Sequence, residues 1–298
     1  MGPSPFRAQN CGSPRRPPFV AFLCGVTRVA SVSALAALPV LGGCAPKLST
    51  GEWQCAPDTG AAGASDLPGQ TDPVAVPWSD GFEDGFCNYS TVETPAYCYG
   101  DGYALVSEPQ PNSGRFAAEF KVIGADEHQT RCVHQGEFPL TAYYSAWYYI
   151  PQPPSDANVW NLWHFRGGDD PGSAHDLWDV SLGNGVNPGD WELMVLDRPS
   201  GFENYRSAGH VKIPIGRWFH IELFLKRTSD STGEVALYQD DQLLFDRTNL
   251  KSDVSKFMQF YFGDWTLNPM ADAVQEDSHL YVDDISIRTT PKSSSATP

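Results

Sequence analysis

Apolar and polar side chains alternate with a period of two over most of the chain beyond residue 78. In the segment 217–227, Phe219 and Ile221 are expected on one face, and the residues that alternate with them, His220 and Glu222, on the other. This alternation predicts half-buried β-strands. Similar patterns predict further strands at 141–150, 160–165, 175–182, 191–196, 234–240, 242–248, 258–265 and 278–287. No window predicts an amphipathic helix of ten or more residues.

The predicted strands favour an all-β fold made of two antiparallel sheets. Each sheet then has one face in a shared core, which is the arrangement of a β-sandwich, and a jelly roll is the simplest form with this many strands. A turn at Asp240-Asp241 predicts a hairpin between two of the strands. Aromatic residues make up 12% of the chain, and 27 Gly and 25 Pro suit a fold with many turns.

The N-terminal region predicts export. The apolar run 29–41 is too short to cross a membrane, and small residues and Cys44 follow it. This order resembles a bacterial lipoprotein signal, so residues 1–44 are expected to be a signal region and Cys44 the lipidated residue. An ordinary secretory signal that is cleaved nearby is the alternative. Translation from Val26 would shorten the signal to a usual length.

Composition divides the rest of the chain. Residues 45–77 are rich in Ala, Gly, Pro and Ser and are expected to form a flexible tether, 78–288 the domain, and 289–298 a disordered tail. The formal net charge is −16. Such an acidic chain is not expected to bind nucleic acid, or a membrane other than through a lipid anchor. The expected location is the cell envelope, or the periplasm or exterior without the anchor.

Four cysteines would remain after lipidation of Cys44: Cys55, Cys87, Cys98 and Cys132. An even number in an oxidising compartment predicts two disulfides, and the sequence leaves all three pairings open.

Local motifs of the domain resemble the concanavalin A-like lectin/glucanase superfamily, and within it the heparin-lyase-like and alginate-lyase-like polysaccharide lyases. The motifs are 78–83 (WSDGFE), 130–132 (TRC), 143–150, 161–164 (NLWH), 216–221 (GRWFHI), 240–241 (DD) and 281–285 (YVDDI). The resemblance implies a jelly roll that handles polysaccharide.

In such lyases the resemblance implies β-elimination at a uronate. Arg131 and Asn161 would neutralise the substrate carboxylate, and His164 would take the C5 proton. The late family motif Y-F-K-x-G-x-Y is altered here, because Tyr261 occupies the lysine position and Trp265 the final tyrosine. The proton donor therefore stays open among Tyr261, Tyr148 and His134.

Further residues are candidates for binding. Trp160 and Trp265 are expected to stack on sugar rings, and His134 and Tyr148 to line the substrate groove. Glu83 and Asp283, on the first and last strands, resemble the structural Ca²⁺ site of the superfamily.

A retaining glycosidase of this superfamily would carry E-x-D-x-x-E on one strand, and the sequence lacks it. Asp176 and Asp179 are three residues apart, so regular alternation places them on opposite faces of a strand. Two functions remain: a lyase acting on an acidic polysaccharide, or a non-catalytic carbohydrate-binding module of the envelope on the same fold.

Overall fold

The computed structural model describes residues 72–90, 95–100, 102–122, 129–153, 160–187, 189–199, 201, 203–267 and 278–291. The expectations for the signal region, Val26, Cys44, Cys55 and the tether up to residue 71 lie outside these residues. Within the described part, no helix is long and apolar enough to span a membrane.

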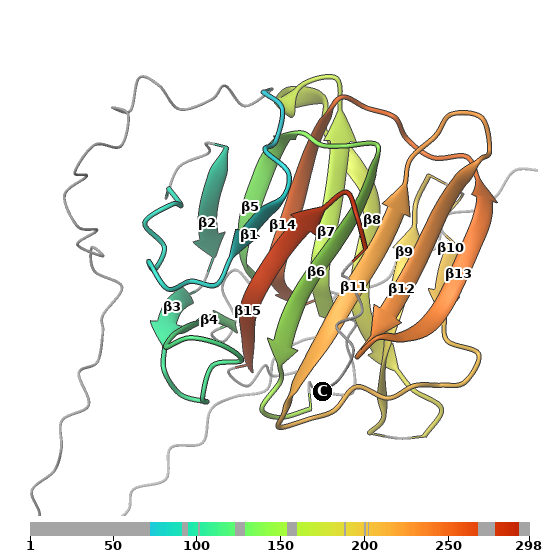
Figure 1. Ribbon diagram of the computed structural model, residues 1–298. Helices are drawn as coiled ribbons and strands as arrows, with labels where there is room; N and C mark the ends of the chain where they lie inside the picture. Colours follow the sequence, from blue (N-terminus) through green and yellow to red (C-terminus); the bar gives the residue numbers. More distant parts are fainter. Residues whose placement is uncertain are drawn as a thin grey trace, which may run out of the picture. The chain divides into compact units, whose positions relative to one another are not determined.

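The described chain forms a jelly-roll β-sandwich, as predicted, and Figure 1 shows its two layers. Every pairing between the named strands is antiparallel. In the order in which they pair, the strands of the first sheet are β13 (Gln242–Leu250), β12 (Gly233–Gln239), β11 (Trp218–Lys226), β6 (Thr141–Tyr149), β15 (Ser278–Arg288), β4 (Ala117–Val122) and β3 (Gly102–Val106). The short β1 (Trp78–Asp80) pairs with β15 and makes this sheet eight-stranded.

The second sheet has seven strands and carries the site described below. Its order is β10 (Glu203–Arg206), β9 (Trp191–Asp197), β8 (His175–Asn184), β7 (Trp160–Gly168), β14 (Phe257–Leu267), β5 (Gln129–Glu137) and β2 (Ala96–Gly100). A 3₁₀ turn, η1 (Pro171–Ser173), connects β7 to β8. Both sheets are therefore built around strands that are distant in sequence, because β14 lies between β5 and β7, and β15 lies between β4 and β6.

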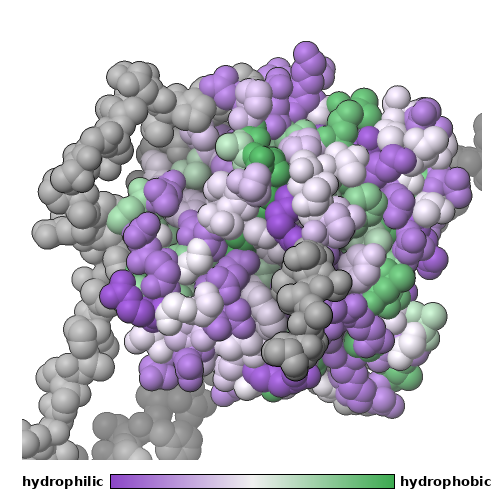
Figure 2. Space-filling view, viewed as in Figure 1, coloured by the Kyte–Doolittle hydropathy of each residue, from purple (hydrophilic) through white to green (hydrophobic). Residues whose placement is uncertain are grey.

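One large aromatic and aliphatic core fills the space between the sheets. The fully buried ring of Tyr144, from the eight-stranded sheet, packs edge-on with Phe165 and Phe260 from the other sheet. Burial of this much apolar area is the main force that holds the sheets together. The side chains that alternate with the core residues form the outer faces of the two sheets. Figure 2 shows polar side chains over most of the visible face, with hydrophobic groups confined to small patches.

Two local features confirm sequence expectations. Asp240 and Asp241 both have positive φ (48° and 63°), the backbone of a type I′ turn, and the hairpin joins β12 and β13. Cys98 on β2 and Cys132 on β5 form a disulfide across two paired strands. The sequence left open which cysteines pair, and this bond identifies Cys98 and Cys132 as partners.

Candidate functional site

The outer face of the seven-stranded sheet carries a band of polar and aromatic side chains across its central strands. The strand register arranges most of them in two neighbouring rows that run across the strands. One row consists of Gln135, Gln259, Arg166 and Asp176; the next consists of Tyr97, Val133, Tyr261, His164 and Asp179. The tyrosines Tyr97 and Tyr261 form a small apolar cluster here that is separate from the core.

A β-bulge in β7 decides which side chains reach this face. Asn161 pairs with Ser181 and Trp163 pairs with Val180, so Leu162 is an extra residue without a partner on β8. The side chain of Leu162 is fully buried in the core. Because the bulge shifts the alternation by one residue, Asn161 and His164 share the outer face although they are three residues apart. Asn161 accepts a hydrogen bond from the Ser181 hydroxyl at 2.7 Å.

A second bulge, in β8, corrects the expectation for Asp176 and Asp179. Phe165 pairs with Trp178 and Arg166 pairs with Asp176, so Leu177 is the extra residue, and its side chain is buried in the core. Both aspartates therefore lie on the outer face, and the prediction that they point to opposite faces was wrong.

The imidazole of His164 is held between these two carboxylates. Nδ1 contacts Asp179 Oδ1, and Nε2 lies 3.2 Å from Asp176 Oδ1. An ionised carboxylate only accepts hydrogen bonds, so satisfying both contacts requires an N–H on each ring nitrogen. The arrangement stabilises His164 as an imidazolium. Hydrogen bonding with His164 is also the main reason that the pKa of Asp176 is lowered to about 2, with smaller contributions from the charges of Arg198 and Arg166.

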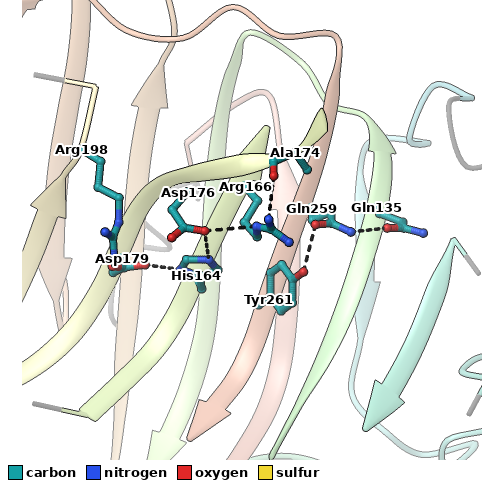
Figure 3. A network of polar contacts seen from close by, with 9 residues as sticks. All are labelled: Gln135, His164, Arg166, Ala174, Asp176, Asp179, Arg198, Gln259 and Tyr261. Atoms are coloured by element: carbon teal, nitrogen blue, oxygen red, sulfur yellow. Dashed lines mark hydrogen bonds and ion pairs between the residues drawn. The ribbon is translucent and has the colours of Figure 1, made fainter. Parts of the chain in front are cut away.

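Arginines extend the network on both sides of His164 (Figure 3). Arg198 Nη2 donates to Asp179 Oδ2 at 2.9 Å. Arg166 Nε donates to Asp176 Oδ1 at 3.1 Å, and its Nη2 donates to the carbonyl of Ala174 at 2.6 Å. Each aspartate thus contacts both His164 and one guanidinium, which leaves an excess of positive charge around the pair.

Tyr261 lies next to His164 on the neighbouring strand, with its ring at 5.3 Å from the imidazole and edge-on to it. The Tyr261 hydroxyl donates to Gln259 Oε1 at 2.9 Å, and Gln259 Nε2 donates to Gln135 Oε1 at 2.7 Å (Figure 3). Arg166 lies on the neighbouring strand and interacts electrostatically with Tyr261. The phenol therefore has an amide acceptor at its hydroxyl and a cation beside it.

Arg131 lies on the other side of Tyr261. Its guanidinium carbon is 5.3 Å from the centre of the Tyr261 ring and 5.3 Å from the centre of the Tyr99 ring. Cation–π contacts of this kind hold a guanidinium in a fixed position on an exposed sheet face. Tyr99 in turn stacks on Tyr97 at 5.7 Å. The two tyrosines of β2 thus support Arg131 at one end of the site.

A comparison of sequences places the domain in a family. Residues 78–286 match the sequence profile of the family described as polysaccharide lyase. The chain belongs to the polysaccharide lyase family. A comparison with curated proteins found no match.

Solved structures share the lyase fold at low sequence identity. A marine alginate lyase from Aplysia kurodai is 11% identical, with a TM-score of 0.50, over 72% of this chain and 98% of that one. An endo-β-1,4-glucuronan lyase from the fungus Trichoderma reesei is 16% identical, with a TM-score of 0.48, over 72% and 95%. The match to the Aplysia enzyme shows a common fold, and its low identity leaves the substrate of this chain to be argued from its own side chains.

The structure brings the four predicted catalytic residues of this lyase to one sheet face. Arg131, Asn161, His164 and Tyr261 all lie on the outer face of the seven-stranded sheet. Two predicted binding residues lie elsewhere. Trp160 and Tyr148 belong to the buried core, where the Tyr148 hydroxyl donates to the Leu162 carbonyl at 3.4 Å. Trp265 is on β14 opposite Thr130, and its side chain lies outside the described residues.

His134 also faces the interior, which corrects its expected place in the substrate groove. Its ring stacks on Trp78 at 4.5 Å and meets Phe138 edge-on at 5.8 Å. Nδ1 is 3.3 Å from the Pro95 carbonyl. Burial lowers the pKa of His134 to about 4, so the ring is neutral at physiological pH. A neutral, enclosed imidazole contributes to packing and cannot reach a glycan on the outer face.

Glu83 and Asp283, the predicted Ca²⁺ ligands, both hold the loop before β4. Glu83 Oε1 accepts from the backbone N–H groups of Arg115 and Phe116, and Asp283 Oδ2 accepts from that of Ser113. Burial raises the pKa of Asp283 to about 6. Within the described ranges, no group of three or more His, Cys, Asp or Glu side chains could hold a metal ion. Since these carboxylates already accept N–H donors, Ca²⁺ binding stays a prediction.

Sequence reasoning missed Arg166, Gln259, Gln135 and Arg198. A signal existed for the first two: Arg166 and Gln259 are each two residues from a predicted site residue, His164 or Tyr261, on the same strand. A period of two therefore places them on the same face. Arg198 follows β9 and had no such signal, because its contact with Asp179 joins separate strands.

Proposed function

We propose that this polysaccharide lyase cleaves a uronate-containing polysaccharide by β-elimination on the outer face of the seven-stranded sheet. The observation that carries the proposal is the environment of Tyr261. Its hydroxyl donates to Gln259, and Arg166, Arg131 and the His164 imidazolium lie around its side chain. The Tyr261 side chain thus lies among three cations and an amide.

The chemistry of β-elimination requires such a setting. Removal of the C5 proton is difficult until the charge of the neighbouring carboxylate is masked, because negative charge then spreads onto the carboxylate oxygens. Arg131 and Arg166 supply cationic donors on either side of Tyr261, and Gln259 and Gln135 supply amide groups. The two arginines fit the substrate carboxylate, and the two buried glutamines hold the Tyr261 hydroxyl.

Tyr261 is the best candidate for the proton transfers. The phenol oxygen, as phenolate, takes the C5 proton; the electrons of the C5–H bond form the C4=C5 double bond as the C4–O bond breaks. The leaving oxygen then takes a proton from the phenol. His164 is less suited to act as the base, because both of its nitrogens face carboxylates. We assign His164 the role of a fixed positive charge beside Tyr261.

The test replaces the Tyr261 hydroxyl alone. Tyr261→Phe should lower kcat on a polyuronate by about 10²- to 10⁴-fold, the range of a lost acid–base group, with binding nearly unchanged. The measurement is the ultraviolet absorbance of the unsaturated uronate product, together with titration of the same glycan by calorimetry. Tyr143→Phe is the matched control, because Tyr143 lies on the outer face of the other sheet against Phe224.

Normal turnover by Tyr261→Phe would contradict the assigned role. Wild-type protein that binds polyuronates but never releases an unsaturated product would favour the alternative, a carbohydrate-binding module on a lyase fold.

A further inference from the structure

A cavity of about 1020 Å³ lies directly beside the His164 network. Its walls come from the start of β8, the turn after β9, Ser231 between β11 and β12, and residues 249–253 at the end of β13. Asp176 and Arg198 line the cavity, and both also belong to the network drawn in Figure 3. Its volume is at the upper end of the range of about 300–1,000 Å³ for small-molecule sites. The cavity is thus large enough for sugar rings beyond the one at Tyr261.

The charges that line the cavity favour an anion. Its acidic groups are engaged within the protein: Asp176 contacts His164 and Arg166, and Asp253 contacts His175 at 3.3 Å and the backbone of Ser255. Lys251, in contrast, is exposed and forms no ion pair with any described residue. Arg198 adds a second cation on the wall nearest His164.

The backbone of the cavity wall is strained at two positions. Ser231 and Asn249 both have φ of 62°, in the left-handed region that non-glycine residues rarely adopt. Such conformations cost about 1 kcal/mol or more each and cluster at binding sites. Both positions are on segments that approach the seven-stranded sheet from the other sheet.

We infer that this cavity binds the glycan chain next to the cleaved linkage and holds a uronate carboxylate on Lys251 and Arg198. The inference rests on the proposed function and names a second contact region for the same substrate. The chain would run across the strands, from Tyr261 over His164 to the cavity beyond Asp176. Recognition of a second carboxylate favours a polymer with acidic groups on successive or near-successive rings. A neutral chain that carries a single uronate would bind less well.

The test uses Lys251→Gln, with Lys256→Gln as a matched control on an exposed residue five positions away that does not line the cavity. The probes are alginate and polyglucuronate, each as polymer and as oligomers of increasing length. Lys251→Gln should raise KM on the polymer about fivefold, as expected for one lost charge-assisted contact, and leave kcat within twofold. The shortest cleaved oligomers should be unaffected, because they do not reach the cavity. Lys251→Glu should raise KM on the polymer further.

Equal KM values for wild type, Lys251→Gln and Lys251→Glu on the polymer would overturn the inference while the lyase function stands. A KM increase that is the same for every oligomer length would also overturn it, because the effect would then come from the long-range electrostatic field of the protein and not from a contact in the cavity. Wild-type protein that cleaves neither polyuronate contradicts the proposed function. In that case calorimetric binding of the polymers decides the inference: weaker binding by Lys251→Gln than by Lys256→Gln supports it, and equal binding overturns it.

Discussion

The two faces of the seven-stranded sheet each carry a histidine next to β14, and the two histidines have opposite properties. His164 on the outer face lies between two carboxylates and is stabilised as a cation. His134 on the inner face lies between aromatic rings, and burial keeps it neutral. The side chain is the same, and both histidines are on strands that pair with β14. The groups on either side of the ring decide whether histidine provides charge or packing.

This comparison separates two kinds of effect. Substitutions on the outer face should change activity more than folding, because that face contributes few side chains to the core. Substitutions on the inner face should change folding and leave activity intact. Asp179 should be an exception that affects both activity and folding, because its side chain is 98% buried although it belongs to the outer face.

The largest effect is expected for Asp179→Asn. The change leaves His164 and Arg198 without their shared buried counter-ion, so the free energy of unfolding should fall by about 3 kcal/mol. The kcat should fall about 100-fold as His164 loses its position. The matched variant Asp176→Asn, at a half-exposed carboxylate, should cost about 1 kcal/mol or less. Denaturant unfolding measures both, and equal losses would contradict this distinction.

A smaller effect, confined to acid pH, is expected for His134→Phe. An unfolded histidine titrates near 6.5, but His134 in the fold titrates near 4. Between these values the unfolded chain binds the extra proton, so wild-type stability falls as the pH falls, by about 3 kcal/mol in total. His134→Phe keeps a ring beside Trp78 and removes this loss.

The check is the difference in unfolding free energy between His134→Phe and wild type at pH 7.5 and pH 4.5. It should shift in favour of the variant by about 2–3 kcal/mol at the lower pH, while lyase activity at neutral pH stays unchanged. The same difference at both pH values would show that His134 is solvated or paired.

The smallest effect is expected for Tyr99→Leu. The change removes one of the two rings beneath Arg131, so KM on a polyuronate should rise about two- to fivefold, as for a partly exposed cation–π contact. Stability should change by less than about 0.5 kcal/mol. Tyr238→Leu, on the outer face of the other sheet, is the control. An equal KM change in this variant would show that the effect does not depend on the contact between Tyr99 and Arg131.

The sequence predicted the architecture because sandwich strands bury every second residue, and the alternation of residues 217–227 reports that directly. The hairpin at Asp240-Asp241 was equally readable, since its turn type depends on two adjacent residues. Six strands, β1 to β5 and β10, were not predicted from alternation; all of them except β5 have six residues or fewer and carry only a few alternating positions. Their pairing in the folded sheets identifies them.

The site was less predictable because it depends on two bulges. The side chains of Leu162 and Leu177 point into the core and shift the alternation of their strands. No residue near either bulge predicts this shift. Regular alternation therefore grouped His164 with Leu162 and separated Asp176 from Asp179. Each bulge depends on how an extra leucine packs in the folded core, which is a tertiary effect. The contacts around His164 could therefore not be derived from the sequence.

The last two strands of the chain occupy central positions in both sheets. β14 joins β5 to β7, and β15 joins β4 to β6. Until residues 257–288 have emerged from the ribosome, the earlier strands are hairpins and ribbons with open edges, and neither layer is continuous. The sandwich can therefore form only after β14 and β15 have been synthesised, and a chain cut short before β14 would expose unpaired edges suited to aggregation.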